Sequence, residues 1–256
     1  MTPHPALAAR SPLAVRLMTR VMRRHLARRF HAVRLAPAAP PAVDPDHALL
    51  VVSNHPSWWD PAFFILLHST LFPDRAGYGP MAAEALGRYR VLERIGIFGL
   101  PEGPAGARLF LRAGDAILRA RRTVLWVTAE GDFSDVRRAP VLRPGVAHLL
   151  RGRAGVTALP LALEYPFWNE STPEALARFG PSLPADPARS VGDWQSALTA
   201  ALSATMARLA EDAIARDPAR FATLLGGSAG IGGPYDLWRR LRALLRGQPA
   251  RLEHGP

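Results

Sequence analysis

The most informative part of the sequence is a short polar segment, SNHPSWWDP at positions 53–61, which places a histidine and an aspartate five positions apart. His55 can titrate near neutral pH, and a carboxylate such as Asp60 can fix the tautomer of a histidine and stabilise its imidazolium. On a regular helix, five positions rotate two side chains about 140° apart. A working pair therefore requires the non-helical turn that Pro56 permits. The spacing is compatible with general-base catalysis, and also with a helix-capping Asp60 and a structural, hydrogen-bonded His55.

Apolar runs and helical patterns alternate around this segment. A buried strand is predicted at Ala48–Val52 and a helix at Pro61–Ser69. Further strands are predicted at 78–82, 95–100, 123–128 and 156–163, and further helices at 84–92, 105–121, 144–150 and 190–216. Residues 36–43 predict a linker, and residues 221–225 the end of a helical pattern. This order predicts an α/β fold with a mostly parallel central sheet flanked by helices.

Composition excludes several classes of protein. The chain has 256 residues, of which 48% are hydrophobic and none is cysteine. Disulfides, cysteine-ligated zinc and thiol nucleophiles are therefore excluded. No apolar run approaches the roughly 20 residues that cross a bilayer, so we expect a protein that does not span the membrane.

The net charge of +11 is concentrated near the N-terminus, where eight arginines between Arg10 and Arg34 precede the first acidic residue, Asp44. We expect a helix here with the arginines at 16, 20, 23 and 24 on one side and the apolar residues at 13, 17, 18, 21 and 22 on the other. Residues 237–246 repeat this pattern, so we expect basic amphipathic helices at both ends of the chain. Such helices suit the headgroup layer of an anionic membrane. Packing on the domain is an alternative, and nucleic acid is the least favoured partner because no binding signature accompanies the arginines.

Residues 54–60 resemble the Asn-His-x-Ser-x-x-Asp block of the glycerolphosphate and lysophosphatidate acyltransferase superfamily. Three weaker blocks follow in the family's order: Gly96-Ile97-Phe98, then Glu130-Gly131, then an apolar run around Pro160. The sequence Arg143-Pro144-Gly145 resembles the basic helix start that follows the family's third block. With this resemblance we expect an α/β acyltransferase domain at 44–225. It is preceded by the basic helix and linker at 1–43 and followed by a Gly-rich connector and helix at 226–256.

The resemblance implies transfer of a fatty acyl group from acyl-coenzyme A or acyl carrier protein to a lipid hydroxyl at a membrane face. His55 would be the base that takes the acceptor's proton, and Asp60 would orient His55. The residues implied in substrate binding are Asn54, Ser57, Trp58, Glu130, Gly131, Ser134 and Pro160. The family needs no metal and no cofactor beyond the acyl thioester co-substrate. We expect a cytoplasmic enzyme, peripheral on the inner face of an anionic membrane, with the acyl donor and the lipid acceptor as partners and no nucleic acid.

Three details of this assignment stay open in the sequence. The aromatic residues Trp58, Trp59, Phe63 and Phe64 are candidates for an acyl-chain entrance or for the core. A turn amide near Gly131 is a candidate donor to the tetrahedral oxyanion.

The third detail is a departure from the family pattern. The family's second block ends in an arginine and its third reads Glu-Gly-Thr-Arg, and both arginines contact the acceptor's phosphate. Here the second block runs into residues 100–103 (LPEG), and the third reads EGDFS at 130–134. Arg94, Arg137 and Arg138 are candidates to compensate. The missing arginines otherwise favour an acceptor without that phosphate, such as a glycolipid or another lipid alcohol.

Two other function classes compete with the acyltransferase. One is a non-catalytic lipid- or membrane-binding relative. The other is a serine esterase, because residues 226–230 (GGSAG) fit a Gly-x-Ser-x-Gly nucleophile elbow around Ser228. That elbow needs a strand before it and a helix after it. We expect the end of a helical pattern before it and a loop after it, so we interpret the segment as a connector.

Overall fold

The computed structural model describes residues 9–227, which form an α/β fold around one nine-stranded sheet. The strand order is β4 (Ile97–Leu100), β3 (Ala76–Ala82), β5 (Thr123–Thr128), β2 (Ala48–Ser53), β6 (Val156–Glu164), β7 (Glu174–Phe179), β1 (Ala32–Ala36) and β9 (Ala222–Gly226), and β8 (Leu183–Pro184) pairs with β6. The first five of these strands are mutually parallel. The pairs β6–β7 and β1–β9 are antiparallel, whereas β7 and β1 are parallel. The predicted class, a mostly parallel sheet flanked by helices, is confirmed.

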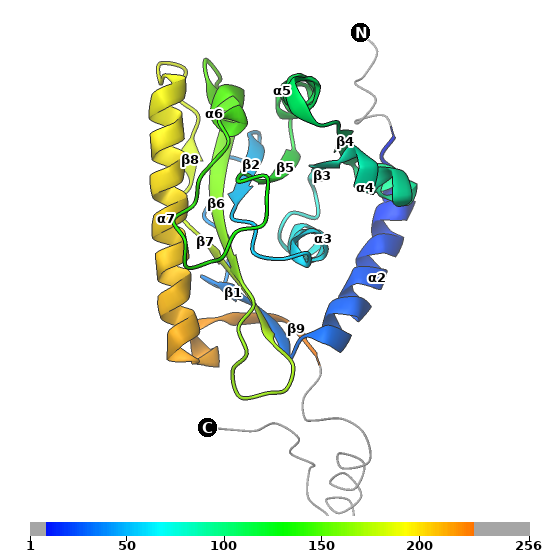
Figure 1. Cartoon of the computed structure of the whole chain (residues 1–256), viewed down its shortest axis with the longest axis vertical. Coiled ribbons are helices and arrows are strands. Elements are labelled where there is room, and N and C mark those ends of the chain that lie inside the picture. The colour runs from blue at the N-terminus through cyan, green and yellow to red at the C-terminus, as the bar shows by residue number, and fades with distance from the viewer. Residues whose placement is uncertain (1–8, 228–256) are drawn as a thin grey trace, which may run out of the picture.

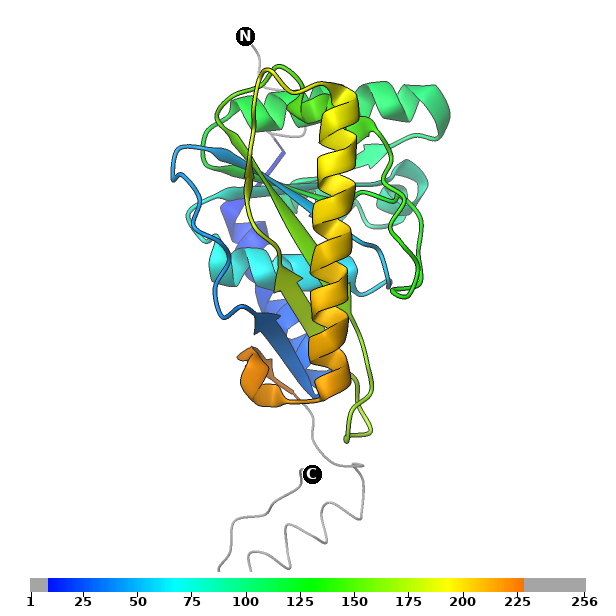
Figure 2. The same cartoon turned by 90° about the vertical axis from the view of Figure 1, so that its left-hand side faces the viewer.

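Helices cover both faces of the sheet (Figure 1). They are α2 (Pro12–Arg29), α3 (Asp60–Leu71), α4 (Ala83–Arg88), α5 (Gly103–Arg119), α6 (Gly145–Leu150) and α7 (Val191–Ala215), with 3-10 turns η1 (Arg90–Ile95) and η2 (Pro218–Arg220). In Figure 2, α7 crosses in front of the sheet. Its start is fixed by a capping box between Ser190 and Asp193.

Strand β2 lies inside the sheet and contributes to the core on both faces. Its alternate residues Leu50 and Val52 pack in the cluster that contains residues of α5, α6 and α7, including Trp194. Leu49 and Val51 point to the other face, into the cluster formed with α2 and α3. All six residues of β2 are buried. The segment at its carboxyl end therefore leaves a rigid, fully packed strand.

Helix α2 is amphipathic, as predicted, but its apolar residues divide between two surfaces. Leu26 is fully buried and Met22 packs against the core that includes α3. Leu13, Leu17 and Val21 remain 75%, 60% and 47% exposed. This outer stripe lies next to the exposed arginines 16, 20 and 24. The second predicted amphipathic helix, 237–246, lies outside the described residues.

Strand β1 was not predicted. Ala36, where we expected the linker to begin, is the last residue of this strand, so the linker begins one residue later. The strand contains Arg34, which at the sequence level belongs to the basic N-terminal segment. In the structure Arg34 is buried and its Nε donates to Glu174 on β7 at 2.8 Å, while its guanidinium also lies over Trp168. A partner 140 residues away in the chain therefore allows an arginine inside the sheet.

Other elements differ from the prediction as well, since strands β7 and β8 were not predicted and several boundaries shift by a few residues. The helix expected at 84–92 ends at Arg88 and continues as η1, and Gly96 then turns the chain into β4 with a φ of 97°. The interpretation of residues 221–225 as the end of a helical pattern was wrong, because 222–226 form strand β9, paired with β1. A strand therefore does precede the Gly-x-Ser-x-Gly segment, whose Ser228 lies outside the described residues.

Candidate active site

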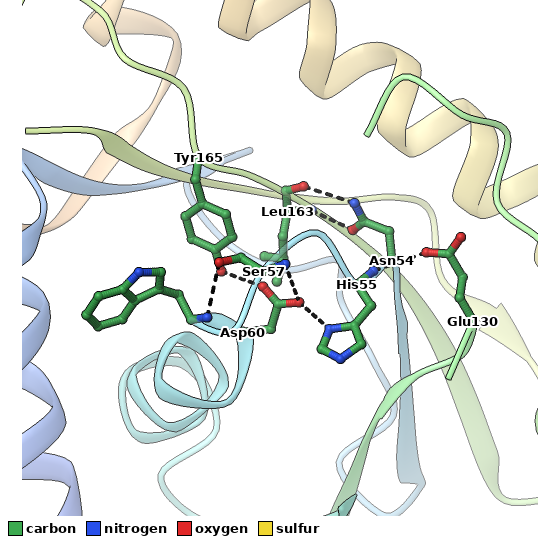
Figure 3. A network of polar contacts seen from close by, with 8 residues as sticks. Asn54, His55, Ser57, Asp60, Glu130, Leu163 and Tyr165 are labelled. Carbon is green, nitrogen blue, oxygen red and sulfur yellow. Dashed lines mark hydrogen bonds and ion pairs between the residues drawn. The ribbon is translucent and has the colours of Figure 1, made fainter. Parts of the chain in front are cut away.

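The candidate site lies where three neighbouring parallel strands end. Strands β5, β2 and β6 are adjacent, and their carboxyl ends lead into Glu130, His55 and Tyr165 respectively. In parallel α/β sheets this edge is where reactive groups collect, because the loops beyond the strands are free to vary on a rigid support. Residues that are distant in the sequence thereby meet around His55 (Figure 3).

His55 and Asp60 form a hydrogen-bonded pair. Residues 54–57 are irregular and 58–59 form a turn, so the chain reverses between the two side chains instead of continuing as a helix. His55 Nδ1 lies 2.6 Å from Asp60 Oδ2. With Nδ1–H donating to the carboxylate, the lone pair of Nε2 points away from Asp60, where an acceptor hydroxyl can approach. This is the geometry that general-base catalysis requires.

The Asp60 carboxylate is held from three sides. It is fully buried at the first position of α3, where the helix dipole favours a negative charge. Oδ2 also accepts from the amide of Ser57 at 3.3 Å, and Oδ1 accepts from the hydroxyl of Tyr165 at 2.7 Å. Burial raises the pKa of Asp60 above its usual value, and the hydrogen bonds from His55, Tyr165 and Ser57 oppose this rise without cancelling it.

Tyr165 was not identified from the sequence. Burial, together with the neighbouring Asp60 carboxylate, raises the pKa of Tyr165 well above its usual range, so the phenol stays protonated and donates. Its ring contacts Phe30 and Phe63, which fixes its position in the core. A usable signal was present, because Tyr165 lies two positions after the end of the strand predicted at 156–163, at the edge where catalytic groups are expected.

The backbone of His55 is clamped to the loop that follows β5. The amide of His55 donates to Glu130 Oε2 at 3.1 Å, and the carbonyl of His55 accepts from the amide of Ser134 at 3.0 Å. Both contacts hold the main chain, so the Glu130 side chain and the Ser134 amide position the histidine. Gly131 turns this loop with a φ of 79°, and its own amide already donates to Thr128, which removes it as a free oxyanion donor.

Asn54 ties the end of β2 to the end of β6. Its Oδ1 accepts from the amide of Leu163 at 2.8 Å, and its Nδ2 donates to the carbonyl of the same residue at 3.0 Å. Asn54 is buried. Its amide is thus engaged with the backbone on both sides, which gives it a positioning role at the base of the site.

The other residues expected to bind substrate occupy different environments. Ser57 shapes the turn, where its Oγ accepts from the amide of Trp59 at 3.2 Å. Trp58 is 68% exposed, whereas Trp59 packs edge-on against Phe30. Pro160 lies inside the sheet opposite Val52, not among the groups bonded to His55 or Asp60.

A second ring that sequence reasoning did not select lies against the imidazole of His55. The ring of Phe133 is centred 4.4 Å from that of His55, and Phe133 is 63% exposed. It occupies the position of the third block where the acyltransferase superfamily carries an arginine. That departure was visible in the sequence, but the contact with His55 depends on how the loop folds back.

The arginines of this loop are paired with its own carboxylates. Arg143 donates to Asp132 at 2.8 Å and to the carbonyl of Glu130 at 3.1 Å. Arg137 makes two bonds to Asp135, at 2.8 and 2.6 Å. These exposed pairs contribute little to stability, but they direct both guanidinium groups toward carboxylates.

Within residues 9–227, no three or more His, Asp or Glu side chains are grouped so that they could hold a metal ion. No helix in the same range is long and apolar enough to cross a membrane.

These features define an α/β protein with a His–Asp pair at the carboxyl edge of a mostly parallel sheet. None of the known protein-family models matches the sequence, and no curated protein matches it. Among solved structures, the chain is similar to the crystal structure of the 1-acyl-sn-glycerophosphate (LPA) acyltransferase PlsC from Thermotoga maritima. The TM-score is 0.53 at 12% sequence identity, over 77% of this chain and 79% of that chain. The chain therefore has a PlsC-like acyltransferase fold, as the resemblance of its sequence blocks predicted.

Proposed function

We propose that the protein is a membrane-associated O-acyltransferase that moves a fatty acyl group from an acyl thioester to a lipid hydroxyl. The observation that carries this proposal is the bond between His55 Nδ1 and Asp60 Oδ2 at 2.6 Å, at the carboxyl edge of the sheet in a PlsC-like fold. Acyl-coenzyme A and acyl carrier protein are the donors to be tested. The similarity to PlsC concerns the architecture of the fold, whereas the proposed chemistry rests on the pair of His55 and Asp60.

In the proposed reaction, Nε2 of His55 takes the proton of the acceptor hydroxyl while its oxygen attacks the thioester carbonyl. Asp60 holds the tautomer and stabilises the imidazolium that forms. The attack forms the new C–O bond, and collapse of the tetrahedral intermediate re-forms the carbonyl and breaks the C–S bond. The proton then passes from His55 to the leaving thiolate. No protein nucleophile is needed, because the acceptor supplies the oxygen. Holding donor and acceptor together supplies much of the remaining acceleration.

The membrane contact is proposed for the outer face of α2. Its exposed stripe of Leu13, Leu17 and Val21 lies beside a row of arginines, a pattern suited to insertion among anionic headgroups. Each arginine near such a surface contributes about 1 kcal/mol. We place the protein peripherally, on the inner, cytoplasmic face of a membrane.

The decisive assay is release of free thiol from long-chain acyl-coenzyme A, and from acyl carrier protein, by protein bound to lipid vesicles with a panel of lipid alcohols. We expect acceptor-dependent release by the wild type and a loss of at least about 100-fold in His55→Ala. His148→Ala is the matched control, because His148 is an exposed histidine on α6, outside the site. Acceptor-dependent release that survives in His55→Ala contradicts the base assignment. Silence of both proteins with every donor and acceptor favours the alternative of a non-catalytic lipid-binding protein.

A further inference from the structure

The ring of Phe133 lies against the imidazole of the proposed base. Nδ1 of His55 is bonded to Asp60, while the Phe133 ring is tilted by 40° over the imidazole at 4.4 Å between centroids. Only 17% of the His55 side chain is exposed, whereas Phe133 is 63% exposed. A group that reaches the base from solvent therefore meets the phenyl ring. A large apolar side chain left in water at such a place gains free energy when a ligand covers it.

The charges around Phe133 do not suit a phosphate. The face of a phenyl ring carries partial negative charge, which attracts cations and polarised C–H groups and repels anions. The two arginines Arg143 and Arg137 already bind the carboxylates of Asp132 and Asp135. The hydrogen bonds from Arg137 hold the pKa of Asp135 below its usual range, and the charge of Arg138, the third arginine of the loop, adds to this effect. A phosphate monoester would compete with these carboxylates, and it would also face the Glu130 carboxylate beneath.

The same surroundings suit hydroxyl groups. Glu130 is half-buried, and only its Oε2 accepts from the His55 amide. Among the described residues, its Oε1 makes no hydrogen bond, and Figure 3 shows it directed away from the histidine backbone. A carboxylate oxygen accepts hydrogen bonds and cannot donate them. A polyol presents hydroxyl donors to such an oxygen and C–H groups to an aromatic face, and it carries no charge for the acidic side chains to repel.

We infer that Phe133 is a specificity-determining residue that selects an acceptor lipid with an uncharged polyol head group, such as a glycosyl ring, over a phosphate monoester. This inference rests on the proposed function and names the acceptor class of that site. Phe133 stacks on the head group, Glu130 accepts from a hydroxyl, and the acceptor oxygen lies at Nε2 of His55. The acyl transfer itself is the one described above.

The kinetic test compares a glucosyl diacylglycerol with lysophosphatidate as acceptors in the same vesicles. We expect the wild type to show at least about a ten-fold higher kcat/KM for the glycolipid. Phe133→Ala should lower this value about ten-fold, mainly through KM, and change little with lysophosphatidate. Phe133→Arg should raise transfer to lysophosphatidate, because it supplies a guanidinium fork at the base. Tyr89→Ala, which removes a similarly exposed ring that makes no ring contact with His55, should change neither.

A second readout separates this inference from the proposed function. Saturation-transfer NMR measures binding of octyl glucoside, below its micelle-forming concentration, and of octyl phosphate, which has the same chain and a charged head. In the inactive His55→Ala background, we expect transfer to octyl glucoside that is lost in His55→Ala/Phe133→Ala, and weaker transfer to octyl phosphate. Binding of this kind without any catalysis would support the inference and sink the proposed function.

Three results would overturn the inference while leaving the transferase intact. The first is a wild-type preference for lysophosphatidate. The second is an equal loss of kcat for both acceptors in Phe133→Ala, which would show that the ring acts on His55 and not on the acceptor. The third is octyl phosphate binding at least as strongly as octyl glucoside.

Discussion

The bond from Tyr165 to Asp60 gives a sharp prediction, because it touches the reacting histidine only through the carboxylate. Tyr165→Phe deletes one hydroxyl and keeps the ring that packs against Phe30 and Phe63. The 2.7 Å bond to Asp60 Oδ1 is lost, while the bond to His55 remains. The variant therefore tests whether the phenol tunes the pair or only fills space.

The sign of the effect follows from which form the phenol stabilises. A donated hydrogen bond favours the anionic carboxylate, so its loss raises the pKa of Asp60 further above its usual value. The active form has neutral His55 and ionised Asp60, and protonating the pair abolishes it. Whichever of the two groups holds that proton, the acid limb of the pH–rate profile moves to higher pH. A hydrogen bond to a charged group contributes about 1.5–3 kcal/mol, and 1.36 kcal/mol corresponds to one pKa unit, so the shift is about 1 unit, with about 2 as the upper bound.

The assay is the pH dependence of kcat/KM for acyl transfer, measured for Tyr165→Phe, the wild type and Tyr89→Phe. Tyr89 is exposed and makes no hydrogen bond to Asp60, so its variant should follow the wild type. Above the acid limb, the loss in Tyr165→Phe should be at most about ten-fold. An unchanged acid limb together with a lower melting temperature would refute the reasoning, because it would give Tyr165 a purely structural role.

Three further predictions concern stability and membrane contact. As pH rises from about 4 to about 7, the free energy of unfolding of Asp60→Asn should increase relative to that of the wild type. The reason is that Asp60 has a raised pKa, so the wild type loses stability as pH rises through that pKa. Urea unfolding at both pH values checks this, and a gain at acid pH alone contradicts it. Leu17→Glu should weaken binding to anionic vesicles about ten-fold or more in a sedimentation assay. The control Ile214→Glu, at a position on α7 that is 80% exposed, should leave binding unchanged. Equal losses in the two variants would contradict a membrane contact through α2. Gly106→Ala should destabilise the fold by about 2 kcal/mol or more, since its Cβ would lie 1.9 Å from the carbonyl oxygen of Pro101. The Cβ of the control variant Gly87→Ala meets nothing within 4 Å, so this variant should be neutral or stabilising. Equal melting temperatures of the two variants would contradict this.

The parts of the fold that sequence periodicity predicted are those with local causes. The parallel strands β2, β5 and β6 are continuous apolar runs, and α7 has both a 3.6-residue pattern and a capping sequence. Strand β1 escaped because its central residue is charged, and that charge is tolerated only through Glu174, a partner from a distant strand. Strand β9 was not predicted, because only its pairing with β1 distinguishes its sequence from the end of a helical pattern.

The candidate site shows the same division. The pairing of His55 with Asp60 was predictable because both residues lie in one short turn with a family-like spacing. The contacts that Tyr165 makes with Asp60 and Phe133 makes with His55 were not predictable in this way. They depend on which loops the sheet brings together. Asn54, which we expect from the sequence to bind substrate, has its side-chain amide bonded to the backbone of Leu163, a contact that the sequence pattern did not indicate.

Under the proposed function, this arrangement should separate catalytic power from acceptor choice, and the separation can be measured. Tyr165 acts on the pair through Asp60 and should change the pH dependence equally for every acceptor. The Phe133 ring contacts the imidazole of His55 directly and should change selectivity at every pH. The two substitutions share no direct contact in the structure, so their effects on the free energy of the transition state should add within about 0.5 kcal/mol in Tyr165→Phe/Phe133→Ala. A larger coupling energy would mean that the Phe133 ring sets the orientation of the imidazole. Proton abstraction by His55 and recognition of the acceptor would then depend on the same contact.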